Sequence, residues 1–407
     1  MRILILATDI YTRGGIARQT YTLASALADL LGPENVDALA LLAYGDPADV
    51  RPRFRVFGPV GEQPTVAAKL WFAAKALGLA RHRYDLIVCS ILSLAPVAAA
   101  IRFVYRTPFW VVCHGTEVWG LLPFLKGVAL RQADLLLPVS RFTAAKLSEV
   151  HRIPQDRVSI LHNAISDAFE RMLPAGAAAR GSGAGVPKRE RTLLSVGSLT
   201  RTHAYKGFDT VIRALPLVLK RAPNLRYVIV GEGDDRPRLE KLAAELHLEK
   251  SVSFAGSVSD AQLAEYYRCC DAFVLPSKTT KRNGSWEGEG FGRVYVEAAL
   301  AGKPVVGSRG GGAAEAVVDG ETGLLVDPAS EEEIAEAIIE LLENPATAAQ
   351  MGRQGRQWAQ QFFTEDALRR SLGGLLGGSK FEPQRGELSQ PRPSAWVQVK
   401  TRSIPKP

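Results

Sequence analysis

Short apolar runs alternate with longer segments of helical periodicity along most of this 407-residue chain. Short apolar runs are typical of buried strands, whereas apolar residues recurring every three or four positions predict amphipathic helices. The pattern predicts strands at 2–7, 36–43, 86–90, 109–113, 135–139 and 158–161, and again at 192–196, 226–230, 252–254, 272–275, 304–308 and 323–326. Helices are predicted between them, for example at 18–31, 208–220, 236–246 and 331–342.

The alternation is interrupted near the middle of the chain, where residues 174–190 are rich in Gly and Ala and predict a flexible linker. Strand–helix alternation on both sides predicts two domains, 1–173 and 191–353, each an α/β fold with a doubly wound parallel sheet. Such sheets bind ligands beyond the carboxyl ends of their strands. Two of them facing each other would therefore place a site in the cleft between the domains.

The chain ends with a predicted helix at 354–376 and a Gly-, Pro- and Lys/Arg-rich tail at 377–407. The helix is placed to cross back to the first domain. The tail has little apolar periodicity, and we expect it to be disordered.

Composition places the chain among soluble globular proteins, with 46% hydrophobic and 23% charged residues. No apolar run approaches the roughly 20 residues that cross a bilayer, and the short run 3–7 predicts a buried strand rather than a signal peptide. The four cysteines, at 89, 113, 269 and 270, lack metal-binding spacing. We expect them to be free thiols in a cytoplasmic protein.

Formal net charge is +8 at pH 7, and the excess of basic residues lies in the first domain, the linker and the tail, while residues 191–360 are net acidic. This distribution argues against one continuous basic face for nucleic acid. It fits a surface that meets anionic lipid or an anionic acceptor. Scattered, solvated arginines are the alternative interpretation.

The segment from Glu289 to Glu297 carries the clearest chemistry. Glu289 lies in a glycine-rich loop, and Glu297 lies within the apolar run 294–300, which predicts a helix. A glycine loop leading into a helix N-terminus favours phosphate, through free amides and the helix dipole. The two carboxylates would repel phosphate but accept hydrogen bonds from sugar hydroxyls. The segment therefore predicts a nucleotide-sugar site.

This segment resembles the E-x7-E element of glycosyltransferase family 4, whose members are retaining enzymes with two Rossmann-like domains, the GT-B fold. The resemblance implies that Glu289 contacts the donor hexose and Glu297 the nucleotide ribose. It also implies that the intervening Gly290, Phe291 and Gly292 belong to the donor site. Similar blocks continue in the family's order over roughly residues 2 to 376.

In the first domain, His114 opens a His-Gly-Thr-Glu-Val-Trp segment directly after the predicted strand 109–113. The resemblance implies that His114 lies near the transferred sugar; a structural histidine bonded to a backbone carbonyl is the alternative. Glu117 and Trp119 are candidates for the acceptor pocket. Gly15, with Gly14, matches the family's glycine pair near the diphosphate, where only glycine lets the backbone approach closely.

The phosphate-binding block departs from the family pattern. Lys206 matches the family's lysine, but Ser198 stands where members usually have an arginine. Arg201 is a candidate substitute because guanidinium binds phosphate bidentately, and Arg293 is a second candidate. The loop 278–286, next to the donor loop, has no family counterpart and is a candidate lid. Glu315 matches another family block but ranks low as a site residue, and Ser140 is explained by helix capping.

The sequence therefore predicts a retaining glycosyltransferase that moves a hexose from a nucleoside-diphosphate sugar to a sugar or lipid-linked acceptor. The resemblance implies neither a metal nor another cofactor, and the chain lacks a convincing D-x-D metal site. A GT-B epimerase or phosphorylase and a non-catalytic nucleotide-sugar-binding protein are the alternatives. Family analogy suggests a role in envelope or extracellular polysaccharide or glycolipid biosynthesis.

The segments 69–75 and 119–126 combine apolar and basic residues, and Leu70, Ala73, Ala74 and Leu77 share one predicted helix face. They predict peripheral contact with an anionic membrane, on the cytoplasmic face of the inner membrane. Packing of this stripe on the domain's own sheet is the alternative.

Overall fold

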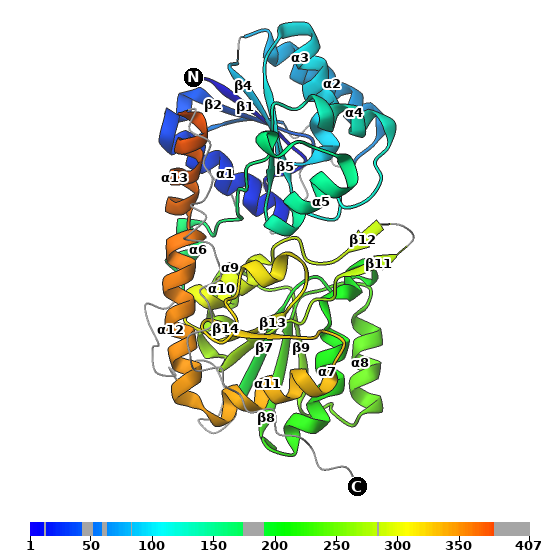
Figure 1. Cartoon of the computed structure of the whole chain (residues 1–407), viewed down its shortest axis with the longest axis vertical. Helices are drawn as coiled ribbons and strands as arrows, with labels where there is room; N and C mark the ends of the chain where they lie inside the picture. Colours follow the sequence, from blue (N-terminus) through cyan, green and yellow to red (C-terminus); the bar gives the residue numbers. More distant parts are fainter. Residues whose placement is uncertain are drawn as a thin grey trace.

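The computed structural model describes residues 1–11, 14–42, 52–58, 63–82, 84–173, 191–282 and 285–377. Two α/β domains lie one above the other along the long axis of the molecule (Figure 1). Each contains a six-stranded sheet in which all paired strands are parallel. The predicted fold class is confirmed.

The first sheet has the strand order β3-β2-β1-β4-β5-β6. Its strands are β1 (Ile3–Ala7), β2 (Val36–Ala40), β3 (Arg55–Phe57), β4 (Leu86–Cys89), β5 (Phe109–Cys113) and β6 (Leu135–Pro138). In β1, Ile3 and Ile5 belong to one hydrophobic cluster and Leu4 and Leu6 to another. Successive side chains of a strand point to opposite faces, so helices must cover both sides of this sheet.

Helix α1 (Gly15–Leu31) packs in the first cluster, and α2 (Val66–Ala80), α3 (Ala95–Tyr105) and α4 (Phe124–Gln132) pack in the second. Helix α5 (Arg141–His151) follows β6 and lies next to the second domain (Figure 1). Short helical turns occur at η1 (Pro33–Asn35), η3 (Leu92–Leu94), η4 (Gln155–Arg157) and α6 (Asp167–Glu170).

The second sheet has the strand order β14-β13-β10-β7-β8-β9. Its strands are β7 (Arg191–Val196), β8 (Leu225–Val230), β9 (Val252–Gly256), β10 (Ala272–Val274), β13 (Val305–Ser308) and β14 (Gly323–Val326). The helices around it are α7 (Phe208–Leu219), α8 (Arg236–Glu245), α9 (Asp260–Cys269), α10 (Arg293–Leu300) and α11 (Glu331–Glu343), with turns η5 (Arg201–Lys206) and η6 (Gly311–Glu315).

An antiparallel hairpin, β11 (Thr280–Arg282) and β12 (Ser285–Glu287), projects from the second domain toward α5 (Figure 1). The sequence predicted a loop here, so that prediction was wrong. The predicted strand at 158–161 was also wrong, because the segment forms only a bridge between Val158 and Leu136. Strand β3 was not predicted. The linker 174–190 and residues 378–407 of the predicted tail lie outside the described residues.

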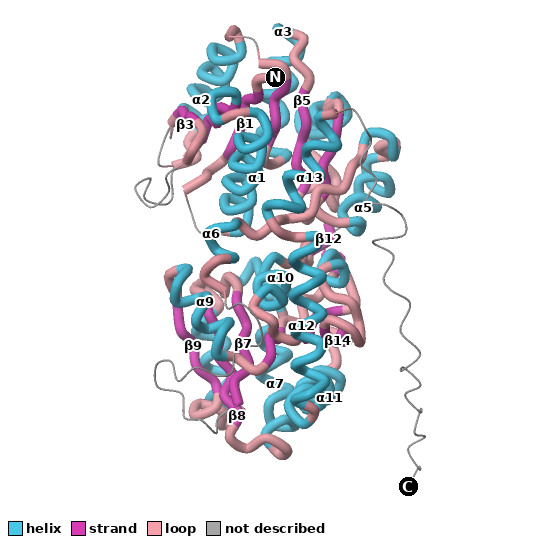
Figure 2. The backbone as a smooth tube through the Cα atoms, turned by 90° about the vertical axis from the view of Figure 1, so that its left-hand side faces the viewer, coloured by secondary structure: helices cyan, strands magenta, loops and turns pink. Residues whose placement is uncertain are grey.

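The chain returns to the first domain through α12 (Pro345–Phe362) and α13 (Glu365–Leu376) (Figures 1 and 2). Helix α12 packs on α10 of the second domain, and α13 packs on α1 of the first. The change of direction lies at Phe363 and Thr364, where the Thr364 hydroxyl accepts a hydrogen bond from the amide of Ala367. The predicted return to the first domain is therefore made by a second helix after this break.

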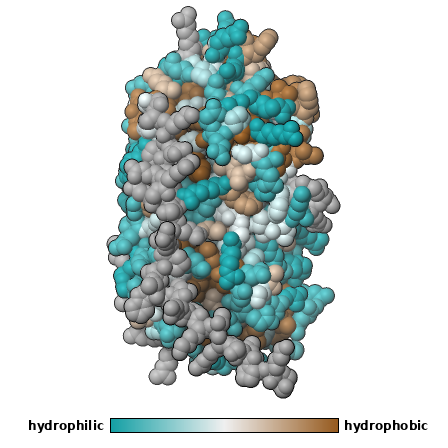
Figure 3. Space-filling view, viewed as in Figure 1, coloured by the Kyte–Doolittle hydropathy of each residue, from teal (hydrophilic) through white to brown (hydrophobic). Residues whose placement is uncertain are grey.

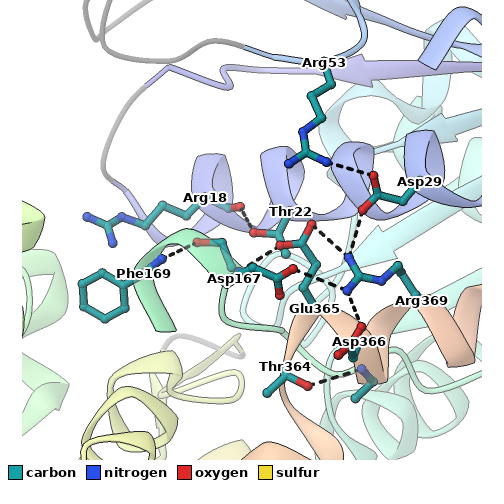
Figure 4. Close-up of polar contacts among 12 residues, drawn as sticks. Arg18, Thr22, Asp29, Arg53, Asp167, Phe169, Thr364, Glu365, Asp366 and Arg369 are labelled. Atoms are coloured by element: carbon teal, nitrogen blue, oxygen red, sulfur yellow. Dashed lines mark hydrogen bonds and ion pairs between the residues drawn. The ribbon is translucent and has the colours of Figure 1, made fainter. Parts of the chain in front are cut away.

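Arg369 fixes α13 on the first domain (Figure 4). Its guanidinium lies 2.9 Å from Asp29 of α1 and 3.4 Å from Asp167, and it also pairs with Asp366. The carboxylate of Glu365 accepts a hydrogen bond of 3.0 Å from the amide of Asp167. The last helix is therefore held to the first domain by charged groups as well as by apolar packing.

Candidate donor site between the domains

Glycines allow the backbones of the two domains to touch at the loop before α10. A Cβ atom on Gly290 would lie 1.8 Å from the carbonyl oxygen of His114, and one on Gly312 would lie 1.9 Å from the carbonyl oxygen of Gly290. Gly292 has φ of +85°, a conformation that side chains rarely adopt, and begins α10. The predicted donor loop therefore lies directly against the His114 turn of the other domain.

Lys206 and Glu289 form an ion pair in this region, with Nζ 2.7 Å from Oε2. The two side chains are 12% and 17% exposed, so solvent screens the pair only partly. Lys206 ends η5, the turn that follows β7, and Glu289 belongs to the loop before α10. The structure thus brings together the predicted phosphate-binding lysine and the predicted sugar-binding carboxylate.

The surroundings of this pair are partly buried. Burial raises the pKa of the Tyr205 hydroxyl, with a further contribution from the Glu289 carboxylate. Burial also lowers the pKa of His203, and Lys206 lowers it further. Both shifts favour the neutral forms of these side chains.

Glu297 lies on α10, 4% exposed, and accepts a hydrogen bond of 3.0 Å from the Tyr267 hydroxyl of α9. Arg293, one turn earlier, donates to the Gln19 side chain at 3.0 Å and to the carbonyl of Ala164 at 2.6 Å. Burial lowers the pKa of Arg293 to about 10, and the nearby Glu297 carboxylate opposes that shift. Arg293 therefore joins α10 to the first domain.

The two candidate arginines occupy different places. The side-chain stem of Arg293 lies 3.9 Å from the position a Cβ atom would take on Gly15, at the N-terminus of α1. Arg201 is exposed on η5, where its amide donates to the Asp234 carboxylate. Arg293, rather than Arg201, therefore lies beside the predicted glycine turn.

The imidazole of His114 lies with Nε2 2.7 Å from the carbonyl oxygen of Ser90, which follows β4. A carbonyl only accepts, so Nε2 carries the hydrogen of this bond. The amide of His114 donates to the carboxylate of Glu117. Glu117, a predicted acceptor-binding residue, therefore closes the turn that holds His114.

Two aromatic residues do not lie where the sequence suggested. Trp119 is fully buried, donates to the Thr143 hydroxyl at 3.2 Å and packs beneath Gly115. It supports the His114 turn rather than lining an acceptor pocket. The Phe291 side chain is 1% exposed and packs on Phe363, so this residue offers the donor site only its backbone.

Helix α5 receives two contacts from the second domain that the sequence did not predict. Both carboxylate oxygens of Glu315 accept hydrogen bonds of 2.9 Å, from the amides of Arg141 and Phe142 at the helix N-terminus. Trp286, on the hairpin, lies with its ring centre 4.2 Å from the ammonium of Lys146. Ser140 caps the helix as predicted, accepting from the Thr143 amide. Glu315 therefore has a structural role, in a contact between the two domains.

The sequence carried signals for both contacts. A carboxylate binds well at a helix N-terminus, but nothing in the sequence shows that Glu315 and α5 meet across the two domains. The Asn-Gly pair at 283–284 is a typical hairpin signal, although most of the residues that flank it are polar.

Within the part of the chain that the structure describes, no group of three or more His, Cys, Asp or Glu side chains has an arrangement that could hold a metal ion. The four cysteines are free thiols, and burial raises the pKa of Cys89, Cys113 and Cys270. The titratable side chains at the meeting of the two loops include Lys206, Glu289 and His114.

Comparison with known proteins adds independent evidence. The family model Glycosyltransferase Family 4 matches residues 13–169, and Glycosyl transferases group 1 matches residues 183–358. A GDP-mannose-dependent alpha-(1-6)-phosphatidylinositol monomannoside mannosyltransferase of Mycolicibacterium smegmatis is 34% identical over 296 residues, which cover 70% of this chain and 73% of that protein. A D-inositol 3-phosphate glycosyltransferase of Streptomyces avermitilis is 32% identical over 248 residues, 58% of this chain and 50% of that protein.

Solved structures agree on the fold. Anabaena Alr3699/HepE in complex with UDP and glucose has a TM-score of 0.73 at 20% identity and covers 93% of this chain and 100% of its own. Sucrose-phosphate synthase of Thermosynechococcus elongatus has a TM-score of 0.75 at 24% identity, with 93% and 99% covered. From its sequence matches and its architecture, this chain belongs to glycosyltransferase family 4 and is a glycosyltransferase with the GT-B fold.

Proposed function

We propose that the protein transfers a hexose from a nucleoside-diphosphate sugar to an acceptor hydroxyl, with retention of the anomeric configuration. The observation that carries this proposal is the Lys206–Glu289 pair at 2.7 Å, in a glycine loop that touches the His114 turn. A cation beside a carboxylate suits the boundary between a diphosphate and a sugar. Glu289 would accept hydrogen bonds from hexose hydroxyls, and Lys206 would neutralise the diphosphate.

The reaction would need little more than positioning and charge stabilisation. The bond between the anomeric carbon and the diphosphate oxygen breaks, and the acceptor oxygen bonds to the same face of the sugar. The proton of the acceptor hydroxyl passes to an oxygen of the departing diphosphate. Lys206 and the amides at the N-terminus of α10 would stabilise the negative charge on that leaving group.

The nucleotide would lie along α10. Glu297 would accept hydrogen bonds from the ribose, with its carboxylate oriented by the Tyr267 hydroxyl. Because the name of the M. smegmatis relative specifies GDP-mannose, we propose GDP-mannose as the first donor to test and a lipid-linked acceptor as the second substrate. Both fit a role in envelope polysaccharide or glycolipid biosynthesis. We propose that the reaction requires no metal and no further cofactor.

The acceptor would be reached at a membrane surface. Leu70 and Trp71 of α2 are 68% and 56% exposed, and Leu121 and Phe124, before and at the start of α4, are 91% and 79% exposed. Phe72 and Ala76 of α2 point instead into the core. We propose that this outer surface of α2 and α4 contacts the cytoplasmic face of the membrane peripherally. Among the described residues, no helix is both long and apolar enough to cross a bilayer.

The test is a transfer assay with labelled GDP-mannose, UDP-glucose and ADP-glucose against lipid extracts, followed by NMR of the product's anomeric centre. We expect one donor to give a product with the donor's anomeric configuration. Inversion would contradict the mechanism. Isomerised donor, phosphorolysis or binding without turnover would favour an epimerase, a phosphorylase or a binding protein instead.

A further inference from the structure

A cavity of about 550 Å³ lies between the last turns of α3 and α4, at the end of the first domain that faces away from the cleft. It adjoins the starts of β5 and β6, because Asp134 in its lining bonds to the amide of Phe109. Parallel strands present their active sites at the opposite, carboxyl edge. The cavity therefore belongs to neither the donor site nor the acceptor side of the cleft.

Arginines dominate the lining, which includes Arg102, Arg106, Arg131 and Arg157, with Asp134 as the acidic member. Arg102 pairs with Asp134, and the Arg157 guanidinium donates to the carbonyls of Arg131 and Ala133. These contacts hold the side chains of Arg102 and Arg157 at the edge of the cavity. One carboxylate against four guanidinium groups leaves the cavity strongly positive.

The same helices place exposed apolar side chains beside these charges. Ala99, Arg102, Phe103 and Arg106 recur at helical spacing along α3 and line the cavity, and Phe103 is 85% exposed. On α4, Arg131 lies seven positions after the exposed Phe124, so the two share a helix face. Hydrophobic side chains are visible on the upper right flank of the molecule, where α2–α4 lie (Figures 1 and 3).

We propose that this cavity binds the phosphate of an anionic phospholipid headgroup while Phe103 and its apolar neighbours enter the lipid interface. Guanidinium groups match phosphate oxygens bidentately. A soluble anion would not explain an almost fully exposed phenylalanine on the cavity wall, whereas a membrane would cover it. The proposal rests on the peripheral membrane contact proposed above and is independent of the donor site.

Arg106 allows a test that preserves folding. It ends α3 in the left-handed conformation, with φ of 63°, where glycine is the least strained residue. Arg106→Gly therefore removes a guanidinium while relieving the backbone, and we expect an unchanged or raised Tm. Combined with Arg131→Gln, it removes two positive charges from the cavity.

The experiment measures binding of the full chain to neutral phosphatidylcholine vesicles and to vesicles that also contain phosphatidylglycerol. Each cationic group at an anionic surface contributes about fivefold in affinity. We therefore expect the double variant to bind anionic vesicles about 25-fold more weakly. The matched control is Arg213→Ala with Lys220→Ala, two exposed charges on or next to α7 of the second domain, and we expect it to stay within about twofold of the wild type.

Three results would overturn the proposal: wild-type vesicle binding by the double variant, an equal loss in the control, or soluble glycerol 1-phosphate binding the cavity as tightly as vesicles do. Nucleoside-diphosphate affinity, measured by calorimetry on the same variants, separates the two proposals. We expect the nucleoside-diphosphate affinity of the double variant to equal that of the wild type. Normal vesicle binding without nucleotide binding would contradict the donor site alone.

Discussion

At the scale of single residues, His114 makes a hydrogen bond typical of a structural histidine, and we propose that it also serves the reaction. Its imidazole donates to the Ser90 carbonyl, as a structural histidine would, while its backbone lies against Gly290 in the donor loop. We expect His114→Ala to lower turnover at least tenfold with little effect on nucleotide affinity, because the residue belongs to the other domain. Steady-state kinetics with calorimetry would measure both.

A matched control exists in His151. Its Nε2 also lies on a backbone carbonyl, that of Val118 at 2.8 Å, but on α5 and outside the donor loop. His151→Ala should lose a comparable hydrogen bond and keep its turnover. Equal kinetics in both variants would return His114 to a purely structural role.

The sequence identified Lys206 and Glu289 as members of one site, and the structure places them in contact. It could not place Trp119 and Phe291, because an aromatic residue in a loop after a strand can line a cleft or fill the core beneath it. Burial of a large ring is worth roughly 1.5–3 kcal/mol, which favours the core unless a ligand is present. The sequence alone does not show whether burial in the core or contact with a ligand gives the lower free energy.

At the scale of elements, α5 depends on a carboxylate from the other domain. Glu315 accepts from two amides at its N-terminus, where negative charge is favoured. We expect Glu315→Gln to reduce the free energy of unfolding by about 1–2 kcal/mol and to increase proteolysis between the domains. Thermal denaturation and limited proteolysis would measure these effects.

Glu343→Gln provides the comparison for that variant. Glu343 pairs with Arg221 on an exposed surface, at 2.7 Å, and such pairs contribute about 0–1 kcal/mol. If the two variants lose the same stability and show the same proteolysis, Glu315 does not join the domains.

The strands that the sequence predicted well are those buried on both faces, such as β1 and β4, whose apolar runs are continuous. Strand β3 escaped prediction because Arg55–Phe57 is a short edge strand with partly exposed side chains. The hairpin was missed because β11 and β12 are polar and their role depends on Trp286 reaching Lys146 of another domain. Contacts between segments that are far apart in the sequence produce no periodic pattern of hydrophobic residues, so a single sequence does not show them.

At the scale of the whole molecule, the two domains are joined by α12 and α13 as well as by the chain before them. Arg369 pairs α13 with Asp29 and Asp167 of the first domain. We expect Arg369→Ala to cost about 1–3 kcal/mol and to speed hydrogen exchange throughout α13 with α12 unchanged. Arg353→Ala, which removes an exposed arginine of α12, should have little effect. Protection of α13 equal to the wild type would show that apolar packing alone holds the helix.

The central claim is that a nucleotide-sugar binds between the loops that meet at Gly290, with Glu297 on the ribose. Calorimetric titration of nucleoside diphosphates into the wild type, Glu297→Ala and Tyr267→Phe tests it most directly. Charge-assisted hydrogen bonds contribute roughly 1.5–3 kcal/mol, so Glu297→Ala should weaken binding about tenfold or more. Tyr267→Phe, which keeps the carboxylate but removes its partner, should weaken binding less. Unchanged affinity in Glu297→Ala, with the fold intact, would contradict the proposed donor site.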